Sequence, residues 1–215
     1  MLSLSLPGDL RTVLCLGAHS DDIEIGCGGT ILQLGASRPN LTVQWVVVSA
    51  VGRRRDEAVR GAELFLGDLR HHHVELQSFD DGFFPYAGAD IKRFFETVKG
   101  ISPDLVFTHS RGDRHQDHRL VNELTWNTFR DHLILEYEIP KYDGDLGTPN
   151  CYVPLPEDIV RGKIERVLAA FPSQAKKPWF DEATFRALMR LRGIECRAAA
   201  GYAEAFHAWK IGLRT

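Results

Sequence analysis

The sequence predicts an α/β fold in which a mostly parallel sheet carries helices on both faces. Short apolar runs rich in β-branched residues alternate along the chain with helical patterns. Such alternation is typical of parallel strands joined by crossover helices. Hydrophobic residues make up 44% and charged residues 26% of the 215 residues, as in an ordinary globular protein. We therefore exclude a disordered, collagen-like or coiled-coil chain.

Strands and helices are expected to alternate through the first 129 residues. The clearest strand is 41–48, which is apolar, β-branched and too short for a helix of its hydrophobicity. Gly67 is a plausible C-cap of the expected helix 55–66. The expected strands are 13–18, 41–48, 73–76 and 104–108, and the expected helices are 26–34, 55–66, 91–99 and 115–129.

The last third of the chain has a different composition. Residues 139–156 are rich in Pro, Gly and Asp, which favours a long loop with short strands. Helical patterns follow at 156–171 and 181–200. Because no linker between independent domains is evident, we expect a single domain over 1–215, in which 137–215 form a substrate-facing C-terminal part.

Charge and cysteine usage narrow the class of protein. Lys and Arg total 26 and Asp and Glu total 29, so we expect no nucleic-acid partner and no acidic membrane surface. The four cysteines are far apart, without a C-x-x-C pair, which excludes a sulfur-ligand zinc site and favours a reducing compartment. With no signal peptide or apolar span in the pattern, we expect a cytoplasmic protein. A homo-oligomer is left open.

The first candidate for chemistry is the run His19-Ser20-Asp21-Asp22, directly after the first expected strand. Imidazole and carboxylate groups are good ligands for a divalent metal. Sites in parallel sheets form at the carboxyl ends of strands. A purely structural interpretation is also open, because Ser and Asp cap helices well and Asp22 could cap the helix that follows.

The second candidate is the segment 113–118, which follows the fourth expected strand. His115 and His118 stand three residues apart and share one face if the segment is helical. Asp117 lies between them and can accept an imidazole N–H. The alternative is a charged helix N-terminus, where the macrodipole favours acidic residues.

Both motifs follow parallel strands, so both should reach the same edge of the sheet. His19, Asp22 and His118 then supply three ligands and leave positions open, which is the pattern of a catalytic rather than a structural zinc site. We therefore predict one Zn²⁺ per chain, with other divalent metals also able to bind. Zinc lowers the pKa of a bound water to about 7.

The combined pattern resembles the LmbE/PIG-L family of zinc-dependent N-acetyl-sugar deacetylases. It is carried by His19-Ser20-Asp21-Asp22, Glu24-Ile25-Gly26, Gly28-Gly29-Thr30 and His115-Gln116-Asp117-His118. The stretches 137–140, 148–150 and 202–206 resemble the bacterial branch that includes bacillithiol-pathway and chitin-fragment deacetylases. The resemblance spans nearly the whole chain and implies a Rossmann-like three-layer fold.

The resemblance implies a role for each matched residue. His19, Asp22 and His118 match the zinc ligands. Asp21 matches the general base that takes a proton from the attacking water. His115 matches the residue that steadies the oxyanion and protonates the leaving amine.

Two further roles are implied by the same resemblance. Asp117 matches the acid that orients His115. Arg54 falls where this branch has a substrate-facing arginine. The flanking Arg53 and Arg55 either begin a solvated helix or contact ligand.

These residues favour a metal-dependent amidohydrolase that acts on a small amino-sugar substrate. It would remove the N-acetyl group from an N-acetylhexosamine in a free sugar, a glycoside or a nucleotide-linked sugar, and release acetate. The alternative is a metal-dependent phosphoesterase, because Asp/His clusters at strand ends also serve phosphoryl chemistry. A binding module with a structural metal is disfavoured, because it would need neither base nor acid.

Other features have plainer interpretations. The glycines of 26–29 do not follow G-x-G-x-x-G, and we expect them to allow close backbone approach under the metal site. The tract 71–73 (His-His-His) is interpreted as the solvated start of a strand. His109 could support the site or be a satisfied core histidine. We expect 138–142, 148–150 and 202–204 to line the sugar side of the pocket.

Overall fold

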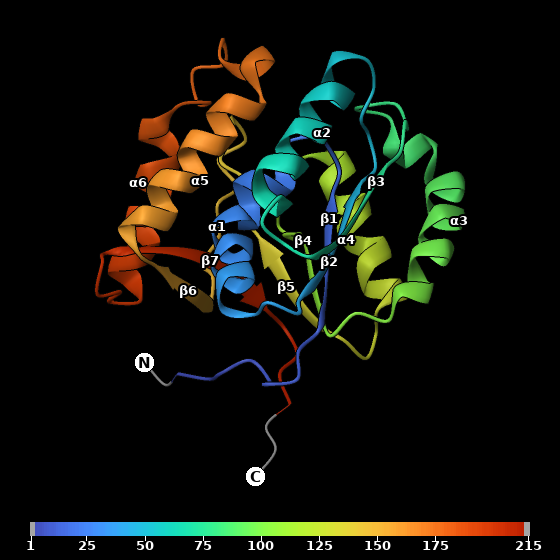
Figure 1. Ribbon diagram of the computed structural model, residues 1–215. Helices are drawn as coiled ribbons and strands as arrows, with labels where there is room; N and C mark the ends of the chain where they lie inside the picture. Colours follow the sequence, from blue (N-terminus) through green and yellow to red (C-terminus); the bar gives the residue numbers. More distant parts are fainter. Residues whose placement is uncertain (1–2, 213–215) are drawn as a thin grey trace.

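The computed structural model describes residues 3–212, which form one seven-stranded sheet between two layers of helices (Figure 1). The strand order is β3-β2-β1-β4-β5-β7-β6. The strands are β1 (Thr12–Gly17), β2 (Thr42–Val47), β3 (His71–Leu76), β4 (Leu105–His109), β5 (Leu133–Tyr137), β6 (Cys151–Leu155) and β7 (Tyr202–Ala208). Strands β1 to β5 pair in parallel, whereas β7 pairs antiparallel with β5 and with β6. The predicted α/β class with a mostly parallel sheet is confirmed.

The helices cover both faces of this sheet (Figure 1). Helices α1, α2, α5 and α6 pack on one face, and α3 and α4 pack on the other. The α-helices are α1 (Asp22–Ser37), α2 (Arg53–Leu66), α3 (Gly88–Val98), α4 (Gln116–Thr128), α5 (Glu157–Ala170) and α6 (Glu182–Glu195). Short 3-10 turns lie at η1 (Phe84–Tyr86), η2 (Lys99–Ile101) and η3 (Pro172–Gln174).

Strand β1 shows why the sheet must be covered on both sides. Val13 and Cys15 belong to the core under α1 and α2, whereas Leu14 and Leu16 belong to the core under α3 and α4. Successive side chains of a strand point to opposite faces, so an unbroken apolar run is typical of a strand buried on both faces. This burial places the polar residues of the first motif just beyond the end of β1.

The sequence pattern does not predict β5 or β7, and the reason is the same for both. Each strand contains a buried glutamate, Glu136 in β5 and Glu204 in β7. Glu136 accepts hydrogen bonds from the indole N–H groups of Trp126 and Trp209. These partners come from other elements, so a charged residue that looks exposed in the sequence is satisfied inside the sheet.

Two helix boundaries differ from the expectation by four residues or more. Helix α1 begins at Asp22, four residues before the predicted start, so Asp22 lies in its first turn. Helix α6 ends at Glu195 rather than near 200, and Arg197 and Gly201 there have positive φ angles of 56° and 79°. The chain leaves the helical conformation at that point to enter β7.

Gly26 allows α1 to pack directly against β5. A Cβ atom added at Gly26 would lie 2.3 Å from the ring of Tyr137, and the hydroxyl of Tyr137 donates to the carbonyl of Leu16 at 2.6 Å. The glycine is therefore required by contact between helix and sheet, and not by approach to a metal site as predicted. None of the helices within residues 3–212 combines the length and apolar character needed to cross a bilayer.

Candidate metal and catalytic site

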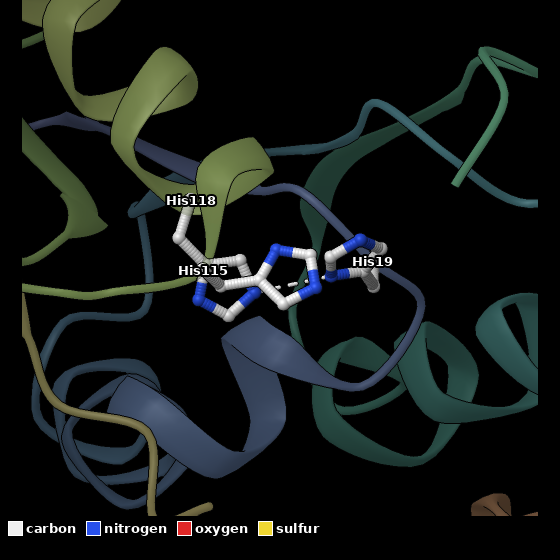
Figure 2. Close-up of side chains that lie close together, drawn as sticks. All are labelled: His19, His115 and His118. Carbon is white, nitrogen blue, oxygen red and sulfur yellow. Dashed lines mark hydrogen bonds between the residues drawn. The ribbon is translucent and has the colours of Figure 1, made fainter. Parts of the chain in front are cut away.

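The carboxyl ends of the neighbouring strands β1 and β4 bring the two sequence motifs together. His19 lies in the turn after β1, and Asp22 opens α1. His115 is the N-cap residue of α4, and His118 lies in its first turn. Figure 2 shows the three imidazole rings facing one another between the turn after β1 and the start of α4.

The three predicted ligands converge on one point. His19 Nδ1 lies 3.1 Å from His118 Nε2 and 3.4 Å from Asp22 Oδ2. His118 Nε2 lies 3.5 Å from Asp22 Oδ1. Ligands bound to a tetrahedral zinc at about 2.0–2.2 Å are roughly 3.3–3.6 Å apart. The spacing and the His₂Asp donor set therefore fit a zinc ion.

Hydrogen bonds behind the two histidines turn the correct nitrogens toward this point. Nδ1 of His118 lies 2.8 Å from Asp113 Oδ2, so the proton on Nδ1 leaves the lone pair of Nε2 free. Nε2 of His19 lies 3.1 Å from Asp117 Oδ2, which leaves its Nδ1 free in the same way. Carboxylates that hold a ligating histidine are the usual second partners in metal sites.

The charges around the site favour the ligating protonation states of His118 and Asp22. Burial, together with the nearby His109 ring, lowers the pKa of His118 to about 4, so its imidazole is neutral at pH 7. Burial opposes ionisation of Asp22, but the neighbouring His118 and His109 hold the pKa of its carboxyl well below the usual value. A neutral imidazole and an ionised carboxylate are the forms that bind metal. Burial opposes protonation of His19, but the carboxylates of Asp117, Asp22 and Asp81 raise the pKa of its imidazole well above the usual value, so a metal ion must displace a proton there.

Asp21 lies beside the predicted ligands and is held by an arginine. Its Oδ1 is 2.6 Å from Arg54 Nη2. Burial raises the pKa of Asp21, although Arg54 acts in the opposite direction. Arg54 also donates to Glu57 Oε2 at 2.8 Å, and Glu57 accepts from the backbone N–H and the hydroxyl of Ser173. This chain of contacts ties the carboxylate of Asp21 to the segment after α5.

The prediction that the carboxylate of Asp117 contacts and orients His115 is wrong. The backbone N–H of Asp117 donates to His115 Nδ1 at 3.3 Å. The carboxylate instead accepts from the N–H groups of Gly82 at 2.6 Å and Phe84 at 3.1 Å, besides its contact with His19. The reason is the helix geometry, because Asp117 in the first turn of α4 faces the 80–84 loop. The ring of His115, whose pKa is lowered by burial and by His19, is half-buried above the site.

Three further residues belong to the site geometry. Asp113 accepts from the backbone N–H of His115 at 2.8 Å as well as from His118. His109 is fully buried, and its Nε2 lies 3.2 Å from Asp22 Oδ2. Asp81 Oδ1 lies 3.0 Å from His19 Nε2. The sequence identifies His109 as a candidate because it lies at the end of an expected strand. No sequence signal distinguishes Asp81 from its neighbours.

A cavity of about 500 Å³ opens over these residues. Its wall includes Arg54 from α2, Lys141 and Tyr142 from the loop after β5, and Lys177 and Trp179 from the segment after α5. Cavities of this size accept drug-sized molecules. The two aromatic rings are perpendicular, with centroids 6.5 Å apart.

The last third of the chain meets this cavity through segments that differ in part from the prediction. Ile139 and Tyr142 line it as expected. Glu204, by contrast, is buried and accepts from the backbone N–H of Gly29 at 2.8 Å, and Asn150 exchanges hydrogen bonds with the backbone of Ala208. These residues fasten β7 to its surroundings, and the sequence reasoning missed the lining segment 174–179.

Comparison with known proteins places the chain in a family. A family model described as PIG-L, GlcNAc-PI de-N-acetylase, matches residues 14–129, more than half of the chain. The chain belongs to the PIG-L family. The matched range contains all the residues of both motifs and ends near the end of α4. The predicted family is therefore confirmed.

Two curated relatives are named as deacetylases. The chain is 29% identical over 149 residues to the uncharacterised deacetylase YaiS of Escherichia coli, covering 64% of this chain and 78% of YaiS. It is 28% identical over 127 residues to a diacetylchitobiose deacetylase of Thermococcus kodakarensis, covering 52% of this chain and 46% of that protein. The predicted enzyme class of deacetylase is confirmed, and the bacillithiol-pathway branch stays a prediction.

Solved structures share the fold across almost the whole chain. An N,N′-diacetylchitobiose deacetylase of Pyrococcus horikoshii has a TM-score of 0.70 at 20% identity, covering 94% of this chain and 84% of its own. GalB, a 4-carboxy-2-hydroxymuconate hydratase of Pseudomonas putida, has a TM-score of 0.69 at 17% identity, covering 96% of this chain and 99% of its own. Because the same fold occurs in a deacetylase and in a hydratase, the fold alone does not determine which reaction this chain catalyses.

Proposed function

We propose that this PIG-L family protein is a zinc-dependent hydrolase that removes the acetyl group from an N-acetylhexosamine-containing substrate. The observation that carries the proposal is the convergence of His19, Asp22 and His118 on one point, with Asp21 and His115 beside it. Ligands, a base and an acid are the groups that metal-assisted hydrolysis of an amide uses.

The residues divide the work of amide hydrolysis among them. Zinc held by His19, Asp22 and His118 would polarise the acetamide carbonyl and lower the pKa of a water molecule. Asp21 takes the proton of the water that attacks the carbonyl carbon, while its contact with Arg54 holds the carboxylate in place. His115, when protonated, gives up the acceptor contact of its Nδ1 with the backbone N–H of Asp117, donates to the developing oxyanion and delivers a proton to the amine nitrogen as the C–N bond breaks.

Several observations support deacetylation over hydrolysis of a phosphoester. Two-metal phosphoesterases hold their ions about 3.5–4 Å apart, which requires carboxylates shared between them. Asp22 is enclosed by His19, His109 and His118, a set that suits a single ion. The relatives named as deacetylases support the same choice.

The experiment is an assay of acetate release across four substrate types. These are a free N-acetylhexosamine, an N-acetylated glycoside such as diacetylchitobiose, a malate conjugate and a nucleotide-linked sugar. We expect acetate from at least one type, loss of activity with a chelator, and recovery with Zn²⁺. Phosphate release from a panel of monoesters, without acetate from any sugar, would contradict the proposal.

A further inference from the structure

Lys141 is a buried lysine in the wall of the cavity, on the loop that follows β5. Its side chain is 9% exposed, and its Nζ lies 3.0 Å from Asp113 Oδ2 and 2.5 Å from Asp145 Oδ2. Both carboxylates are buried as well, and Asp145 also accepts from the backbone N–H of Arg114 at 2.7 Å. Because a buried ammonium group needs charged partners, these two contacts determine where the end of Lys141 lies.

Asp113 lies between Lys141 and the first turn of α4. Its Oδ2 is 2.8 Å from His118 Nδ1, and its Oδ1 accepts from the backbone N–H of His115 at 2.8 Å. The oxygen that meets His118 is therefore the same oxygen that meets Lys141. A displacement of Asp113 would release His118 Nδ1 and turn Nε2 away from the point where the predicted ligands converge. Lys141 is thus the outer end of a chain of contacts that leads to a predicted zinc ligand.

The loop that carries Lys141 is fastened at both ends by contacts that do not involve Lys141. Glu138 accepts from the guanidinium group of Arg192 in α6 at 2.7 Å and 2.9 Å. It also accepts from the backbone N–H of Gly147 at 3.2 Å, and Arg192 donates to the carbonyl of Gly147 at 3.1 Å. The backbone on either side of Lys141 is therefore anchored, so a change of its side chain acts mainly on Asp113.

We propose that Lys141 is a positioning residue of the metal centre, which holds Asp113 and through it the zinc-binding orientation of His118. The inference rests on the proposed function, because it takes His118 as a zinc ligand. Lys141 lies outside the range 14–129 that the family model matches, so the C-terminal third contributes to the metal centre as well as to the cavity. The next residue, Tyr142, lines that cavity, and one loop therefore carries both a support of the metal and a wall of the substrate pocket.

The sign of the effect distinguishes positioning from charge repulsion. An ammonium group near a divalent cation repels it, so removal of the charge alone would strengthen zinc binding. Loss of the contact that holds Asp113 would weaken it instead. We expect Lys141→Met to lower zinc affinity about tenfold, the lower end of the loss that follows removal of a partner behind a metal ligand.

The test measures the zinc affinity of the metal-free protein by competition with a chelator. The chains compared are wild type, Lys141→Met, Asp113→Ala and the double variant. If Lys141 acts through Asp113, the double variant binds zinc no more weakly than Asp113→Ala alone, because coupled residues have non-additive effects. Lys177→Met is the matched control and should bind zinc as wild type does. Lys177 lines the same cavity, but its Nζ lies over the ring of Trp179, 5.4 Å from the centroid.

The Nδ1 proton of His118 gives a readout that a purely structural role would not change. A hydrogen bond to the carboxylate of Asp113 shifts the resonance of this proton downfield and protects it from exchange with water. We expect the downfield resonance in zinc-loaded wild type and in Lys177→Met, and its loss or an upfield shift in Lys141→Met. NMR of protein labelled with nitrogen-15 at histidine measures it.

Lys141→Met leaves Asp113 and Asp145 as two buried carboxylates without the cation between them. Buried charges that lose their partner destabilise a fold strongly, so urea unfolding first checks that the variant folds. If it does not, the four chains are compared again in an Asp145→Asn background, where one of the two charges is absent. The expected outcomes in that background are the same.

Three results would overturn the positioning role. These are a Lys141→Met chain that binds zinc as tightly as wild type or more tightly, additive effects of Lys141→Met and Asp113→Ala, and an unchanged His118 resonance in Lys141→Met. A wild-type chain that binds zinc but releases no acetate from any substrate would overturn the proposed function and leave the positioning role in place. A wild-type chain that binds no zinc would overturn both.

Discussion

Asp113 determines which nitrogen of His118 faces the metal point. Its carboxylate holds Nδ1 of His118 at 2.8 Å and is also 3.0 Å from Lys141 Nζ. We expect Asp113→Ala to lower zinc affinity about 10–100-fold, as loss of such a partner usually does. Competition with a chelator measures this affinity. Asp143→Ala, which alters a carboxylate of the cavity wall outside the predicted ligands and their partners, should leave the affinity unchanged.

A variant of Asp21 distinguishes the chemical step from metal binding. Asp21→Asn keeps the size of the side chain and its ability to accept from Arg54, but it removes the base. We expect zinc content to stay at wild-type level while kcat falls about 10²–10⁴-fold. Elemental analysis and acetate release measure the two quantities. An active Asp21→Asn enzyme would refute the role of Asp21 as general base.

Among the elements, α1, α5 and β7 are joined by a buried ion pair that also sets the position of the site. Lys163 Nζ in α5 lies 2.6 Å from Glu204 Oε1 in β7, and it donates to the backbone carbonyl of Ile25 in α1 at 2.6 Å. Glu204 also accepts from Thr30. Because Asp22 opens α1, this contact holds a helix that carries a predicted ligand.

Breaking that pair should destabilise the fold strongly. Lys163→Met leaves Glu204 buried without its counter-charge, and we expect a loss of about 3–5 kcal/mol in the free energy of unfolding. Adding Glu204→Gln should recover part of the loss. Lys92→Met is the control, since the pair of Lys92 with Glu96 is exposed and exposed ion pairs contribute little to stability. Urea unfolding measures the free energy of unfolding of the two single variants and the double variant. Equal losses of this free energy in Lys163→Met and Lys92→Met would contradict the prediction.

For the whole molecule, the C-terminal third completes the cavity over the strand ends. Tyr142 and Trp179 come from separate segments of this third and face the site from one wall. Aromatic faces stack on sugar rings, and binding that is equal in the ground state and the transition state changes KM alone. We expect Tyr142→Ala to raise KM with zinc content unchanged.

The control for this prediction is another exposed tyrosine. Tyr86 is 86% exposed and does not line the cavity, so Tyr86→Ala should leave KM at the wild-type value. Steady-state acetate release with the best substrate of the panel measures both variants. A KM that is unaffected in Tyr142→Ala would place substrate binding on another part of the wall.

Local sequence patterns are enough to predict the layered α/β class and the residues that converge at the ends of β1 and β4. Apolar runs specify buried parallel strands, and the carboxyl ends of parallel strands lie at one edge of a sheet. The positions of His19, Asp22 and His118 along the chain, each shortly after such a strand, therefore suffice to predict that the three side chains meet.

The way those residues are held, and the segments that surround them, depend on tertiary packing. Asp117 finds its backbone partner Gly82 from 35 residues away, and Glu204 finds Gly29 from 175 residues away. No local pattern encodes such pairs, which is why neither β7 nor the partner of Asp117 follows from the sequence pattern. A buried polar group must find a partner wherever the folded chain supplies one, so the packing of distant segments decides its contacts.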